Sequence, residues 1–167
     1  MASDPSISSN NRSSLLRSII IGGLIIGTFQ FVIQLFLVSS LFYKNPFVTV
    51  MQYLSSSAIG NAAFQGSLTT ALLGVIFHYF VSFVVAGVFI LSADRIPVLR
   101  RHVIVGSLLY GIGVAIIMNF VVLPLSAAPS LPPPTPLQFL WLIIESALFI
   151  GLPLGILIRR SADIEKQ

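Results

Sequence analysis

Four long apolar stretches follow one another along the chain, separated by short segments that carry charges, serines or prolines. They cover residues 17–43, 66–92, 103–123 and 137–158. About 20 apolar residues in a helix cross the hydrocarbon core of a bilayer, so each stretch is long enough to span it. Backbone groups in lipid must bond within their own segment, which favours helices. We therefore expect an all-α integral membrane four-helix bundle, with a single domain over residues 15–160.

The second predicted span carries one ionisable side chain, His78, near its middle. At 3.6 residues per turn, its face is shared by Ala71, Gly74, Ser82 and Val85, and the opposite side carries Leu73, Ile76, Phe80 and Phe83. Transmembrane helices pack through small residues and leave bulky apolar ones to the lipid, so His78 should point into the protein. A similar small and polar face occurs in the first span, formed by Gly23, Gly27, Gln30 and Gln34.

The distribution of lysine and arginine predicts the topology. With four spans, eight of the nine basic residues fall on one side of the membrane, and Lys44 alone falls on the other. The positive-inside rule then puts both termini in the cytoplasm. Residues 45–65 are also uncharged, but a fifth span there would move Arg95, Arg100 and Arg101 to the outer side. We expect this segment to be an interfacial helix or a re-entrant segment.

The segments outside the spans are polar or rich in proline. Residues 1–14 contain many serines and asparagines and should form a disordered cytoplasmic tail, and residues 161–167 a second cytoplasmic tail. Pro124 should end the third span, and the proline-rich loop after it should be an extended, rigid spacer. Pro153 should kink the fourth span near its cytoplasmic end.

Composition agrees with the membrane class. Charged residues make up 8% of the chain, against about 25% in soluble domains, which is too few to cover a soluble surface. The net charge of +4 does not predict nucleic-acid binding, because the basic residues flank apolar runs and form no aromatic-interleaved patch. The absence of cysteine excludes disulfides and thiolate chemistry. We expect the bilayer as the partner, with anionic lipid at Arg100, Arg101, Arg159 and Arg160.

Five polar side chains within the spans form a candidate intramembrane site in the outer half or at the midplane: Gln30, Gln34, His78, Asn119 and Glu145. Glu145 is the costliest, since a carboxylate at the bilayer centre costs about 2.5 kcal/mol or more. It should be protonated, paired or facing water, and a hydrogen bond or ion pair with His78 is the natural pairing. The alternative is that these side chains only hold helices together, at about 0.6 kcal/mol each.

The fourth span has a second small face, formed by Ala147, Gly151 and Gly155, on a different side from Glu145. If Glu145 faces the inside of the bundle, this stripe faces outward and predicts contact with a second copy or a larger membrane protein. If the stripe packs internally, Glu145 is left to meet a partner.

Motifs for catalysis are absent. The chain has no metalloprotease, nucleophile-elbow, phosphate-loop or dinucleotide-binding motif. The spans contain no second histidine that would build a haem or metal site with His78. We expect no catalytic residue, no metal, no cofactor and no enzymatic activity.

Three phrases carry a resemblance to a known family: GVIFHYFVSFVVAGVF, RIPVLRRHVIVGSLLYG and MNFVVLPLSAAP. Together they resemble an uncharacterised family of small four-span bacterial inner-membrane proteins over residues 65–130. The resemblance implies a bacterial inner (plasma) membrane and carries no activity with it. His78, Asn119 and Pro124 lie inside the matching phrases, and Glu145 lies outside them.

Two functions remain open from the sequence. The first is a non-enzymatic scaffold or accessory membrane component whose polar residues only pack helices. The second is a small transporter or channel component that handles a proton or polar solute through His78 and Glu145. Access of water to these two residues would distinguish the two functions.

Overall fold

The computed structural model describes residues 5–33, 35, 47–130, 132 and 134–164, and within these ranges it describes side chains from residue 14 to residue 160. Every regular element in the described part of the chain is a helix, and no strand occurs there. The predicted all-α class is therefore confirmed.

Four helices are long and apolar enough to cross a membrane: Ser14–Ile33, Ser67–Arg95, Val103–Leu125 and Pro136–Arg160. They are formed by α1 (Pro5–Ile33), α3 (Ser67–Arg95), the run of α5 (Val103–Ile117), η3 (Met118–Val122) and α6 (Leu123–Leu125), and the run of α7 (Pro136–Ser146), η4 (Ala147–Gly151) and α8 (Leu152–Ile164). The chain is thus compatible with a multi-pass membrane protein, as the four apolar stretches predict.

The first helix begins earlier than predicted. It begins at Pro5, inside the segment predicted to be a disordered tail. The sequence has a start signal there, since Asp4 precedes Pro5 and proline is favoured in the first helical position. At the other end α1 is described as far as Ile33; beyond it Leu35 is described, whereas Gln34 and residues 36–43 of the predicted span lie outside the described residues.

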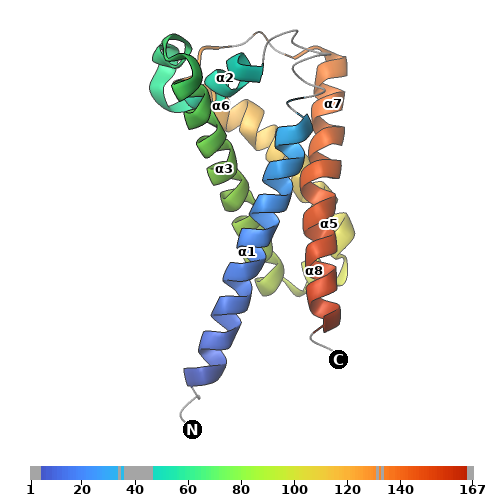
Figure 1. The fold of residues 1–167 in the computed structure, drawn as a ribbon. Coiled ribbons are helices and arrows are strands. Elements are labelled where there is room, and N and C mark those ends of the chain that lie inside the picture. Colours follow the sequence, from blue (N-terminus) through green and yellow to red (C-terminus); the bar gives the residue numbers. More distant parts are fainter. Residues whose placement is uncertain (1–4, 34, 36–46, 131, 133, 165–167) are drawn as a thin grey trace.

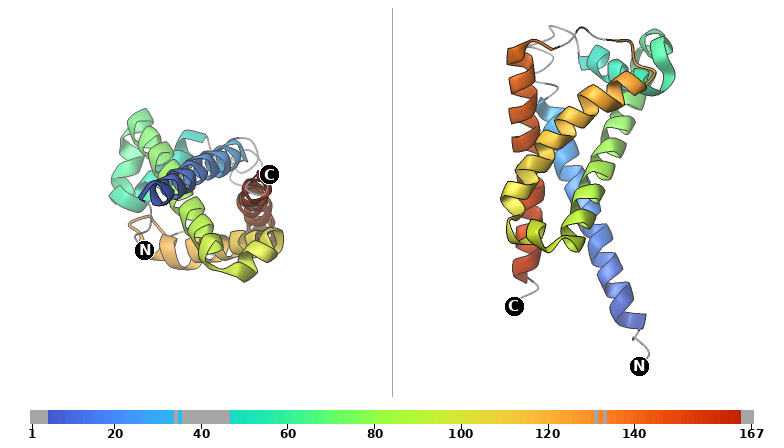
Figure 2. Two further views of the ribbon diagram at one scale, coloured as in Figure 1. Left: turned by 90° about the horizontal axis from the view of Figure 1, so that it is seen from below. Right: turned by 180° about the vertical axis from the view of Figure 1, so that it is seen from behind.

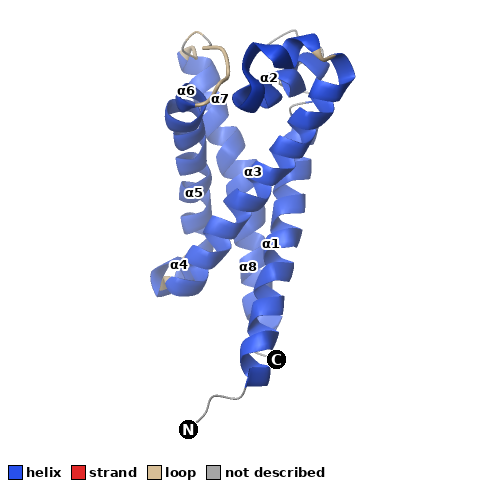
Figure 3. Cartoon of the chain, turned by 90° about the vertical axis from the view of Figure 1, so that its left-hand side faces the viewer, coloured by secondary structure: helices blue, strands red, loops and turns tan. Residues whose placement is uncertain are grey.

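Two helical hairpins make up the bundle. α1 packs along α3, and α5 packs along α7, η4 and α8. The start of α1 and the end of α8 lie at one end of the bundle, together with α4 (Pro97–Arg101), whereas α2 (Phe47–Ile59) and α6 lie at the other end (Figures 1 and 2). Figure 3 shows α3 running obliquely from α4 up to the end where α2 lies.

The buried core lies toward the end that holds α4. Phe89 of α3 and Leu154 of α8 are completely buried and belong to one cluster with Ile26 and Ile150. Tyr110 of α5 packs against Phe89 with ring centroids 4.9 Å apart, and its hydroxyl donates a hydrogen bond of 2.8 Å to the Val85 carbonyl. Apolar packing and an interhelical hydrogen bond therefore join the two hairpins at this end.

The small stripe of the fourth span packs inside the bundle, against α5. A side chain at Gly151 would overlap the Ser107 carbonyl oxygen, and one at Gly155 would overlap the Ser107 hydroxyl. Gly111 of α5 makes the reciprocal approach to the backbone of Ser146 and Ala147. Of the two alternatives that the sequence leaves open, the structure shows the stripe packed internally, where α5 covers it.

Three further glycines join α3 to α1 and α2. Gly23 and Gly27 of α1 lie against Phe83 and Tyr79, and Gly74 of α3 lies against the backbone of Met51 in α2. On the far side of α3, large side chains such as Ile76 and Phe80 are exposed. The small face of α3 thus contacts α2 at Gly74, whereas α1 packs its glycines against Tyr79 and Phe83. The prediction that Phe83 faces lipid is wrong, and Ile76 and Phe80 are free for lipid.

Each of two prolines follows a widened π-helical turn. The backbone N–H of Leu123, before Pro124, bonds to the Met118 carbonyl, and that of Leu152, before Pro153, bonds to the Ala147 carbonyl. Proline lacks an N–H, and its ring clashes with the carbonyl four residues earlier, so the helix opens to bonds five residues apart. At Pro153 the structure therefore has a π turn where the sequence predicted a kink.

Candidate intramembrane cavity

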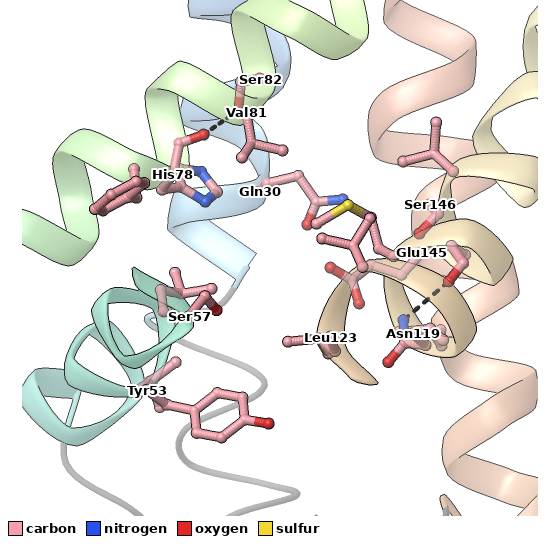
Figure 4. A pocket seen from close by; sticks show the side chains of 18 of the residues that line it. Gln30, Tyr53, Ser57, His78, Val81, Ser82, Asn119, Leu123, Glu145 and Ser146 are labelled. Atoms are coloured by element: carbon pink, nitrogen blue, oxygen red, sulfur yellow. Dashed lines mark hydrogen bonds between the residues drawn. The ribbon is translucent and has the colours of Figure 1, made fainter. Parts of the chain in front are cut away.

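A cavity of about 560 Å³ lies between the two hairpins, beside α2 (Figure 4). Its polar lining comes from five different helical segments and comprises Gln30, Thr49, Tyr53, Ser57, His78, Ser82, Asn119, Gln138, Trp141, Glu145 and Ser146. Apolar side chains such as Phe77, Val81 and Leu142 form the rest of the wall. A largely apolar cavity of this size with a few converging polar groups is typical of a small-molecule site.

Glu145 is the most unusual side chain of the cavity. It lies in the last turn of α7, just before the π turn of η4, and it is only 6% exposed. Its side chain lines the cavity, and no described residue gives it a hydrogen bond or an ion pair. A buried carboxyl group without a partner is costly, so this arrangement favours a ligand or water as its partner.

His78 has a protein partner, but it is not Glu145. Its Nε2–H donates a hydrogen bond of 2.8 Å to the carbonyl of Gly27 in α1. The predicted hydrogen bond or ion pair between His78 and Glu145 is therefore not formed, although both residues line the same cavity. The reason is helix pairing: α3 packs along α1, whereas α7 packs along α5.

The separate environments of these two residues predict additive effects on stability. We expect His78→Phe to cost about 0.5–1.5 kcal/mol by removing the hydrogen bond to Gly27. In a double-mutant cycle with Glu145→Gln, the coupling free energy should stay below about 0.5 kcal/mol. Chemical unfolding in detergent of the natural protein, the two single variants and the double variant measures this coupling free energy. A coupling above about 1.5 kcal/mol would show that the two side chains interact directly.

The amides predicted for the site fall into two groups. Gln30 and Asn119 line the cavity, and Asn119 Nδ2–H donates a hydrogen bond of 2.9 Å to the Ala115 carbonyl of its own helix (Figure 4). Gln34 lies outside the described residues. The structure thus brings together Gln30, His78, Asn119 and Glu145 around one space.

Sequence reasoning missed the contribution of α2. Thr49, Tyr53 and Ser57 line the cavity from this helix. The loop after α6 holds α2 in place, because the Tyr53 hydroxyl donates to the Pro129 carbonyl at 3.4 Å and Ala127 N–H donates to the Ser57 carbonyl at 3.1 Å. Their spacing in the sequence could have identified them, since Thr49, Tyr53 and Ser57 are each four residues apart and residues four apart in a helix share a face.

The described residues contain no group of three His, Cys, Asp or Glu side chains that would hold a metal ion. No protein-family model matches the chain, and comparisons with curated proteins and with solved structures give no match. The cavity itself is therefore the feature from which a function is inferred.

Proposed function

We propose that the chain is an inner-membrane protein that binds a small organic molecule in this cavity, as a small transporter or channel component and not an enzyme. One observation carries the proposal: a carboxyl group, that of Glu145, is 6% exposed, has no partner among the described residues and lines a cavity of about 560 Å³. A scaffold that only packs helices has no use for such a group, and natural interiors leave few voids larger than a water molecule.

The proposed topology puts both termini in the cytoplasm and the cavity toward the extracytoplasmic side. Arg95, Arg100 and Arg101 around α4 and Arg159 and Arg160 at the end of α8 are exposed at the end of the bundle that holds the core. Positive charge concentrates on the cytoplasmic side of membrane proteins, where it meets anionic headgroups. In this orientation α2 is the interfacial segment, and it covers the extracytoplasmic end of the cavity.

Single cysteines test the proposal cleanly, because the natural chain has none. We expect a membrane-impermeant methanethiosulfonate, added outside intact cells, to label Ser130→Cys in the exposed outer loop and Ser146→Cys in the cavity. Arg101→Cys in the turn between α3 and α5 should react only after permeabilisation. Ser107→Cys is the matched control for Ser146→Cys, because Ser107 is fully buried between α5 and α8.

The pattern of labelling decides between the two functions left open by the sequence. Labelling of Ser146→Cys without labelling of Ser107→Cys supports a cavity that admits polar molecules from outside. If neither cysteine reacts while Ser130→Cys does, the cavity is closed and the scaffold function is favoured. Labelling of Arg101→Cys in intact cells would reverse the topology.

A further inference from the structure

We propose that the ligand of this cavity is an organic cation with apolar substituents, and that Glu145 is its counter-ion. This inference rests on the proposed function and adds the chemical class of the ligand. The charged side chains that face the cavity support this class. Among the described residues of the lining, Glu145 is the only acidic side chain, and neither lysine nor arginine is present.

Two other polar groups of the lining already have protein partners, whereas the Glu145 carboxyl group has none among the described residues. His78 already donates its Nε2–H to the Gly27 carbonyl, and Asn119 donates to the Ala115 carbonyl. An anion in this cavity would meet the carboxylate without a positive side chain to balance it. A cation would pair with the Glu145 carboxyl group, to which no described residue is bonded.

The walls of the cavity suit the apolar part of such a molecule. Tyr53, Phe77 and Trp141 line it together with aliphatic side chains. The face of an aromatic ring attracts a cation, and the attraction is stronger where water is excluded. An aromatic and aliphatic wall around a single carboxylate is typical of a site for a substituted ammonium or a similar lipophilic cation.

A bare metal ion fits the cavity poorly. Calcium and magnesium take about six or more oxygen ligands, usually with several carboxylates or waters. The described residues offer Glu145 without a second acidic group beside it. The size of the space also exceeds what one ion and its ligands fill, since cavities of about 300–1,000 Å³ are typical of organic ligands.

The chain carries its own probe for binding. Trp141 is its single tryptophan and lines the cavity, so a ligand that enters changes its fluorescence. We would titrate the full-length protein in uncharged detergent with tetraphenylphosphonium and with tetraphenylborate, which have the same shape and opposite charge. We expect a saturable change with the cation and none with the anion beyond that seen for empty micelles.

The variant Glu145→Gln keeps the shape of the side chain and removes the charge. Because tetraphenylphosphonium has no hydrogen-bond donor, its attraction to the carboxylate is electrostatic, and we expect loss of that charge to weaken binding of the cation about tenfold or more. Asp94→Asn is the matched control, since Asp94 is an exposed carboxylate of α3 that pairs with Arg100 at 3.3 Å. Binding to this control should equal binding to the natural protein.

Each outcome decides the proposal. Equal or tighter binding of the anion, equal binding of the cation by Glu145→Gln, or no binding of either ion would overturn it. If Glu145→Gln does not fold, the comparison of the two ions on the natural protein still decides. The labelling of Ser146→Cys measures access to the cavity independently, so a wrong ligand class is distinguished from a cavity that binds nothing.

Discussion

Gly111→Ala should lower the stability of the protein by about 3 kcal/mol, the upper end of the usual cost of overpacking. The new methyl group would overlap the Ser146 carbonyl oxygen and lie 3.0 Å from the Cα atom of Ala147. Both are backbone atoms, so α5 and the end of α7 must move apart. Thermal unfolding in detergent, followed by helical circular dichroism, measures the loss.

Gly113 provides a control on the same helix. A Cβ atom there meets nothing within 4 Å. Alanine favours a helix over glycine by up to about 1 kcal/mol, so Gly113→Ala should be neutral or slightly stabilising. Equal shifts for the two variants would mean that the close crossing of α5 with the fourth span does not exist in solution.

Gly74→Ala should displace α2 and thereby disturb the cavity. A Cβ atom at Gly74 would overlap the Met51 carbonyl oxygen and lie 3.2 Å from the Met51 Cα atom. Met51 is completely buried and α2 is held by the loop after α6, so the helix has little room to shift. We expect a loss of about 2–3 kcal/mol in unfolding and a changed emission spectrum of Trp141.

Gly87→Ala is the matched control on α3. Its Cβ atom would lie 3.7 Å from Ile19 Cγ2, an ordinary van der Waals contact. This variant should keep both the stability and the Trp141 spectrum of the natural protein. A Gly74→Ala protein with unchanged unfolding and unchanged emission would contradict the packing of α2 on α3.

The lengths of the helices and their apolar character were predictable from the sequence because they depend on local properties. Runs of apolar residues predict the spans, and the bulky face of α3 correctly predicts that Ile76 and Phe80 are exposed, although Phe83 of the same face packs against Gly23 of α1. Which helix meets which was not predictable. The small faces of α1, α3 and the fourth span are chemically alike, so glycine positions alone do not select their partners.

The same limit applies to the candidate site. The predicted depth of each polar residue in the bilayer follows from counting residues from the end of its span. Four of the five predicted residues do line one cavity. The predicted direct pairing of His78 with Glu145 is wrong, because the His78 side chain donates its hydrogen bond to the backbone carbonyl of Gly27 instead. Sequence patterns identify side chains that need a partner, but every residue of a neighbouring helix offers a carbonyl.

The π turn before Pro153 sets how α8 is rotated relative to α7, and so where the stripe of Gly151 and Gly155 points relative to Glu145. The widened turn of η4 acts as one inserted residue between them, and each residue of an α-helix rotates the following side chains by about 100°. A deletion of one residue from η4 would undo this rotation, so that the helix would keep either its contact with α5 or its carboxyl group in the cavity, but not both.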